Sequence, residues 1–176
     1  MADGQSVLVT VAWSVGVVGI AFGGYTAVSL LVDLHERGHL WQLARDAANR
    51  RGKPMLVVGS PKAQWDLFPL YPYGDVTIDI EPHDVQVKKV DVMEVGKVFA
   101  PKQFGSAFVS HVLEHVSDPV LALQQLYKVA DEVFIAGPSP WGAMAWLVPS
   151  HRWIIHQAPP YGTFKFGANP LYREGL

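Results

Sequence analysis

The segment 110–116, with the sequence SHVLEHV, holds the densest group of side chains that could do chemistry. His111, Glu114 and His115 follow the spacing H-x-x-E-H, at which two imidazoles on one helix can bind zinc while the glutamate acts as a base. Ser117-Asp-Pro begins a new helix directly afterwards, which predicts a loop or short turn here. No third ligand on a downstream helix is evident, so we predict no metal site. Each histidine could instead hold a hydrogen-bonded structural position near a strand end.

A second set of candidates follows apolar runs that predict strands. Gly59 ends the run at residues 55–58, and Asp79, which ends the next run, comes 20 residues later. That interval is familiar from nucleotide-binding sites of doubly wound sheets. Asp91 follows a third run. An ordinary solvated strand end is the alternative for both carboxylates.

These residues need a sheet to position them. We predict strands at residues 55–58, 75–80, 85–90, 106–110 and 132–136. The clearest helix follows Ser117, which we predict as its N-cap, with Asp118 and Pro119 in the first turn. Strands alternating with helical or irregular crossovers predict an α/β fold with a small, mostly parallel, Rossmann-like sheet of about five strands.

In this order of elements, residues 54–138 resemble the class I S-adenosylmethionine-dependent methyltransferases, in particular the methyltransferase type 11-like group. The features that carry the resemblance are a strand ending in Gly59, a strand ending in Asp79, the pair Asp91-Val92, the SHVLEHV segment after the fourth strand, and a helix leading to a fifth strand.

The resemblance implies S-adenosylmethionine as the cofactor. It implies these cofactor-binding residues: Gly59, Ser60, Asp79, Asp91, Val92 and Ser110. Gly59 would let the backbone approach the cofactor. Asp79 would accept hydrogen bonds from the ribose hydroxyls, and Asp91 and Val92 would flank the adenine. His111 would line the methionine end, and it is the one candidate for a catalytic base.

Two departures from the family's pattern keep a second function open. The first turn contains Gly59 alone, with Pro61 in place of a further glycine, and proline has no N–H to donate. Only 40 residues follow Ala136, where complete members have two more strands. We therefore predict either a membrane-anchored methyltransferase of unknown acceptor, or a catalytically inactive methyltransferase-like domain acting as a structural or assembly subunit of a membrane protein complex.

The N-terminal segment predicts a single membrane anchor. No residue from Gly4 to Val32 is charged, and as a helix this stretch could reach about 43 Å, more than a hydrocarbon core of about 30 Å. A cleaved signal peptide is the alternative, disfavoured by Asp3 and by the lack of a basic n-region. Basic residues follow the span: Arg37, Arg45, Arg50, Arg51 and Lys53. They predict a cytoplasmic domain and an N-terminus outside.

Gly16, Gly19 and Gly23 fall near one face of that helix and would permit close approach of another transmembrane helix, although glycine is also common in such helices. Behind the anchor (1–32) we expect an amphipathic helical connector (33–53), the methyltransferase-like domain (54–138), and an aromatic-rich extension (139–176) that covers the domain or contacts the bilayer or a partner. A formal net charge of −2 argues against nucleic acid as a partner. The absence of cysteine excludes disulfides.

Overall fold

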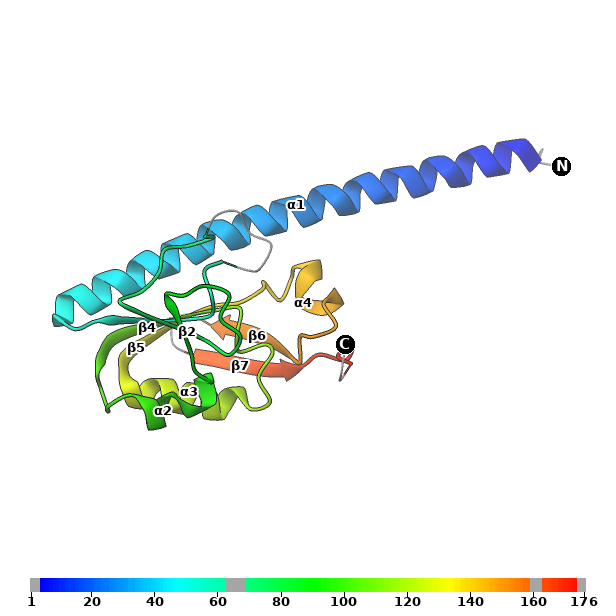
Figure 1. Cartoon of the computed structure of the whole chain (residues 1–176). Coiled ribbons are helices and arrows are strands. Elements are labelled where there is room, and N and C mark those ends of the chain that lie inside the picture. The colour runs from blue at the N-terminus through cyan, green and yellow to red at the C-terminus, as the bar shows by residue number, and fades with distance from the viewer. Residues whose placement is uncertain (1–3, 63–68, 159–162, 174–176) are drawn as a thin grey trace.

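The computed structural model describes residues 4–62, 69–158 and 163–173. In it the expected anchor and connector form one helix, α1, which runs from Gly4 to Arg51 and projects far beyond the rest of the chain (Figure 1). Between Val17 and Val32 its large apolar side chains are exposed. α1 is long and apolar enough to cross a membrane, a property that a signal sequence shares. Gly52, with φ +61°, ends it in the left-handed conformation.

Five parallel strands form the central sheet, in the order β3-β2-β1-β4-β5. Their bounds are Met55–Val58 (β1), Val76–Asp79 (β2), Val87–Lys89 (β3), Phe104–Ser110 (β4) and Ala130–Ala136 (β5). These strands confirm the predicted parallel α/β sheet. The strand order reverses between β1 and β4, so their carboxyl ends flank a topological switch point, where open α/β sheets bind ligands.

The C-terminal part of α1 covers one face of the sheet. Its buried residues pack on the side chains of this face: Leu40, Ala44 and Ala48 against Met55, Val57, Tyr71, Phe108 and Ala136. The helix lies very close to β4, because a Cβ on Gly105 would come within 2.9 Å of the Ala48 Cα. Ser106 Oγ also donates to the Ala44 carbonyl at 2.6 Å. The segment expected as a connector is thus one layer of the domain.

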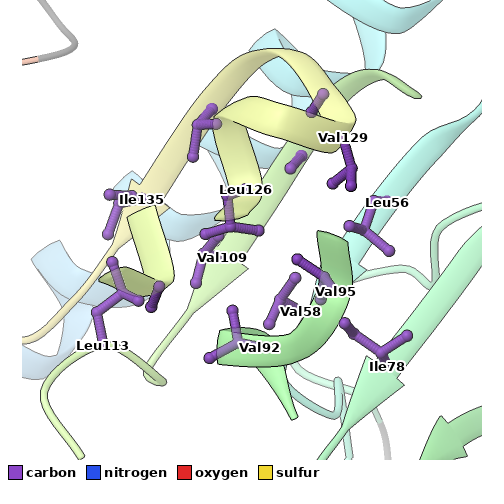
Figure 2. Packing of buried hydrophobic residues seen from close by; sticks show 14 of the residues in the cluster. Leu56, Val58, Ile78, Val92, Val95, Val109, Leu113, Leu126, Val129 and Ile135 are labelled. Carbon is purple, nitrogen blue, oxygen red and sulfur yellow. The ribbon is translucent and has the colours of Figure 1, made fainter. Parts of the chain in front are cut away.

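Three short helical elements cover the opposite face: η1 (Val92–Glu94), α2 (Val95–Val98) and α3 (Pro119–Val129). The cluster beneath them, much of it labelled in Figure 2, includes Leu56, Val58, Ile78, Val95, Val109, Leu126 and Val129. Because successive side chains of a strand point to opposite faces, the four residues of β1 are buried alternately under α1 and under α3. Burial on both faces is what a parallel sheet requires.

The N-cap of α3 is Asp118, so the prediction of Ser117 as the cap is wrong by one residue. Asp118 Oδ1 accepts a hydrogen bond from the Leu121 N–H at 2.9 Å, and Pro119 occupies the first helical position. Proline fits there because that position has no intrahelical partner for an N–H. The residue directly before it then becomes the cap.

The C-terminal extension contains α4 (Ala143–Leu147) and an antiparallel hairpin of β6 (Trp153–Ala158) and β7 (Thr163–Ala168). From the sequence we expected an aromatic-rich extension over 139–176 and assigned no strand within it. Ile155, Phe164 and Phe166 pack against the cluster under α3. The Glu114 carbonyl accepts from the Arg152 N–H at 2.7 Å, which joins this extension to the segment after β4.

Candidate functional site

A cleft of about 660 Å³ lies at the carboxyl ends of β1, β2 and β4. All of the residues predicted from the sequence to form a site are among those that line it: Gly59, Ser60, Asp79, Asp91, Val92, Ser110 and His111. The tertiary structure brings them together because the ends of parallel strands meet at one edge of the sheet. The volume is that of a small-molecule site.

Gly59 forms the turn between β1 and the rim of the cleft. Its φ is +98°, and a Cβ there would overlap the Ser110 carbonyl oxygen and lie 3.0 Å from the Val112 side chain. Its N–H donates to the Ile78 carbonyl at 3.0 Å. This position therefore requires glycine, both for its conformation and for the close approach of β4.

Asp79 ties the ends of β1 and β2 together. Oδ2 accepts from the Ser60 N–H at 2.6 Å, and Oδ1 accepts from the Glu81 N–H at 2.9 Å. Each carboxylate oxygen can accept a second hydrogen bond. Asp79 is half-buried and lines the cleft, so it can receive ligand hydroxyls while holding the turn.

Asp91 and Ser110 line other parts of the cleft. Asp91 caps η1, with Oδ1 accepting from the Met93 N–H at 2.8 Å, and it places the buried Val92 at the cleft wall. Ser110 ends β4 and is buried. These positions combine an apolar surface with a few polar groups, as ligand pockets do.

His111 connects the cleft to α1. It follows β4 in the left-handed conformation, with φ 52°. Its Nε2 lies 2.6 Å from Arg37 Nη2 and 3.4 Å from Asp33 Oδ2, and its Nδ1 lies 3.2 Å from Glu114 Oε1. Arg37 in turn donates to Asp33 at 2.8 Å. A half-buried histidine is thus surrounded by two carboxylates and one guanidinium.

Burial alone would lower the pKa of His111, but Asp33 and Glu114 outweigh it and raise that pKa to about 9. Burial likewise opposes the charge on Asp33, yet His111 and Arg37 together lower the Asp33 pKa. The short Arg37 contact is a hydrogen bond only to an Nε2 without a proton, because a guanidinium can only donate. Arg37 and Asp33 therefore compete for this nitrogen.

Tyr71 lies under the turn formed by Gly59. Its hydroxyl donates to the Gly59 carbonyl at 3.1 Å, and its ring meets Phe108 edge-on at 5.3 Å. Burial raises the pKa of Tyr71 to about 12, so the phenol stays neutral and supports the turn as a donor.

Sequence reasoning missed Tyr71, and it used Arg37 only for orientation. Asp33 and Arg37 are four residues apart, a spacing that places them on one face of a helix. Their ion pair could therefore have been predicted from the sequence. Tyr71 comes from an irregular segment, in which no sequence pattern indicated that its side chain would lie under Gly59. Trp65 and Phe68, two aromatic residues of the segment between β1 and β2, lie outside the described residues.

Comparison of the chain with models of known protein families, with curated proteins and with solved structures finds no match. The fold alone defines the class: an α/β protein with a five-stranded parallel sheet and a long apolar N-terminal helix. Its function has to be inferred from the geometry of the site.

Proposed function

We propose that this protein is a membrane-anchored methyltransferase that uses S-adenosylmethionine. The observation that carries the proposal is convergence: the residues at the ends of β1, β2 and β4, together with Asp91 and Val92, line one cleft at the switch point of the sheet. They are the positions at which the sequence resembles class I methyltransferases. In this assignment Asp79 accepts from the ribose hydroxyls, Val92 packs on the adenine, and Ser110 adjoins the methionine part.

The reaction would transfer a methyl group in line. A nucleophilic atom of the acceptor forms a bond to the methyl carbon while the bond from that carbon to the sulfonium sulfur breaks and leaves a thioether. With a pKa of about 9, His111 holds its proton near neutral pH, and a general base has to be unprotonated. The proposal therefore assigns catalysis mainly to the positioning of the two reactants.

The position of the cleft favours an acceptor held in the membrane. We propose that α1 spans the bilayer with its N-terminus outside and the sheet in the cytoplasm, as the basic residues after the span indicate. Arg37 lines the cleft and follows Val32, the last residue of the apolar stretch, by about 8 Å of helix. The cleft would then open beside the bilayer surface, where an amphipathic acceptor can reach it.

The C-terminal extension supports the same placement. The Tyr25 hydroxyl donates to the Trp141 carbonyl, and Ser29 and Leu30 line a second, smaller cavity together with Pro138 and Gly142. Trp141 is 85% exposed and Leu147 57% exposed. Tryptophan is enriched at membrane interfaces. We therefore place residues 141–147 in the headgroup region beside α1.

A structural or assembly subunit of a membrane complex is the second candidate. The first turn has Gly59 alone, followed by Pro61. On α1, a Cβ at Gly16, Gly19 or Gly23 would meet no described residue within 4 Å, which leaves room for a helix of another subunit. In that function the cleft would bind no S-adenosylmethionine.

Calorimetric titration of the full chain in nanodiscs with S-adenosylmethionine and S-adenosylhomocysteine tests the first candidate. We expect micromolar binding, weakened about tenfold or more by Asp79→Asn, because a hydrogen bond to a charged group contributes about 1.5–3 kcal/mol. Asp84→Asn is the matched control: Asp84 also accepts from a turn N–H, that of Gln86 at 3.0 Å, but it is not among the residues that line the cleft.

Thermal unfolding of each variant separates lost binding from lost folding. Absence of binding by a folded full chain would rule out the enzyme and leave the subunit function. If Asp79→Asn and Asp84→Asn weaken S-adenosylmethionine binding equally, Asp79 does not bind the ribose.

A further inference from the structure

Glu114, His115 and His151 form a cluster that the proposed methyl transfer does not use. One ligand atom from each lies within 4.8 Å of those of the other two. Glu114 and His115 come from the segment after β4, whereas His151 comes from the loop before β6. That segment forms turns and contains no helix. The cluster is therefore a tertiary one, distinct from the helical arrangement that the H-x-x-E-H spacing suggests.

Glu114 is the least expected member, because it is completely buried. Neither carboxylate oxygen has a hydrogen-bond partner within the described residues. Oε1 lies 3.2 Å from His111 Nδ1 as an ion pair. A carboxylate is costly to bury unless it is paired and hydrogen-bonded, or coordinates a metal ion. The charged His111 pairs with Oε1, whereas Oε2 has no partner among the described residues. The unfilled bonding capacity of Oε2 is what a further cation would meet.

Each of the two histidines contacts a backbone carbonyl through Nδ1, as metal-ligating histidines usually do. His115 Nδ1 lies 3.1 Å from the Ser150 carbonyl, and His151 Nδ1 lies 3.3 Å from the Ala145 carbonyl. Such contacts place the proton on Nδ1 and leave the Nε2 lone pair for a metal. The rings lie edge to face with centroids 4.8 Å apart, so both can approach one ion.

The backbone fixes the relative position of the two segments. The Glu114 carbonyl accepts from the Arg152 N–H at 2.7 Å and from the Trp153 N–H at 3.2 Å. Trp153 Nε1 donates to the Val116 carbonyl at 2.8 Å. The three candidate ligands are therefore held by structure that exists before any ion binds, which reduces the entropic cost of binding.

We propose that Glu114, His115 and His151 bind one divalent transition-metal ion, with zinc as the reference ion. Two imidazoles and one carboxylate are a ligand set that zinc accepts, and three protein ligands leave a position for water or another molecule. The ion would bind the Glu114 carboxylate together with the two imidazoles and so link the C-terminal extension to the turn after β4. His115 also lines the cleft, so the ion would lie at its edge, but the proposal of this site does not rest on S-adenosylmethionine binding.

The test uses the full chain, purified in detergent with a tag that contains no histidine, stripped with a chelator and dialysed. Titration with Zn²⁺ followed by metal analysis should give one ion per chain, and Zn²⁺ should raise the melting temperature. Co²⁺ should give the visible absorption of a site with nitrogen and oxygen ligands. We expect His115→Asn and Glu114→Gln to weaken zinc binding at least about tenfold.

His115 is exposed, so His115→Asn tests the site even if Glu114→Gln fails to fold. His156→Asn is the matched control, because His156 is also exposed and belongs to β6. Loss of stoichiometric zinc in His115→Asn but not in His156→Asn supports the site. Zinc binding that is absent in the parent chain, or equal in the parent and in His115→Asn, overturns it.

Discussion

Gly59 lies so close to Ser110 that no side chain fits between the ends of β1 and β4. A Cβ on Gly59 would overlap the Ser110 carbonyl oxygen, and the glycine adopts a φ of +98°. The close approach of two neighbouring strands, and not a loop rich in glycine, shapes this part of the cleft.

Gly59→Ala should destabilise the protein and deform the cleft. We expect a loss of about 2–5 kcal/mol, the sum of backbone strain and overpacking. Binding of S-adenosylmethionine, if present in the parent, should fall as well. Thermal and chemical unfolding in detergent measure the first effect, and calorimetry measures the second.

Gly52→Ala provides the control for conformation alone. Gly52 also has a positive φ, +61°, but a Cβ there would meet no atom within 4 Å in the part of the chain that the structure describes. It should cost only about 1–2 kcal/mol, the usual penalty of the left-handed region. Equal losses in the two variants would show that the contact with Ser110 has no effect.

Asp75 should make stability depend on pH in the acid range. Burial opposes its charge, but hydrogen bonds from the Met55 N–H at 2.7 Å and from Arg45 at 2.6 Å lower the Asp75 pKa below its ordinary value of 3.8. Its stabilising contribution is complete above the unfolded pKa and is lost as pH falls through the lower pKa of the folded state. Asp75→Asn should lower the melting temperature at pH 6.

The difference between parent and Asp75→Asn should shrink as the pH falls below about 4. Asp46→Asn, at an exposed position on α1, serves as the control for a general loss of negative charge. A difference that stays constant from pH 6 to pH 3 would contradict the assignment.

Leu40→Ala should destabilise the sheet, because α1 is part of its core. Leu40 is 2% exposed and packs in the cluster beneath α1, so truncation should cost about 2–5 kcal/mol. Leu30→Ala makes the same change on the same helix at a residue that is 53% exposed, and it should change the unfolding free energy little. Similar losses in both would mean that α1 does not pack on the sheet as described.

Single cysteines can test the membrane placement, because the parent chain has no cysteine. With a membrane-impermeant maleimide, Asp3→Cys should react in intact cells and Lys88→Cys only after permeabilisation. Trp141→Cys should react slowly even then, because we place it in the headgroup region. Lys88 is exposed on β3, which makes it the reference for full access.

Reaction of Lys88→Cys in intact cells would reverse the proposed orientation. Equal rates for Trp141→Cys and Lys88→Cys in permeabilised cells would remove residues 141–147 from the bilayer surface. A protein recovered from cells without residues 1–32 would identify the N-terminal segment as a signal sequence.

Local patterns were sufficient to predict most of the sheet. The five apolar runs became β1 to β5 with boundaries shifted by two residues or fewer, and the helix before β5 formed as predicted, one residue beyond the expected cap. Buried parallel strands can be predicted from the sequence because both of their faces need apolar residues, which appear as continuous apolar runs. The hairpin of β6 and β7 was not predicted, because its stability depends on packing against the cluster under α3.

The sequence by itself determined the apolar N-terminal helix, the parallel sheet and the residues at the strand ends, since these depend on periodicity and on turn chemistry. Only the tertiary structure decided that α1 continues onto the sheet, because its small residues meet Gly105 of a distant strand. It also placed Tyr71 beneath Gly59 and His151 beside Glu114. Sequence periodicity relates residues only a few positions apart, so it does not predict these tertiary contacts.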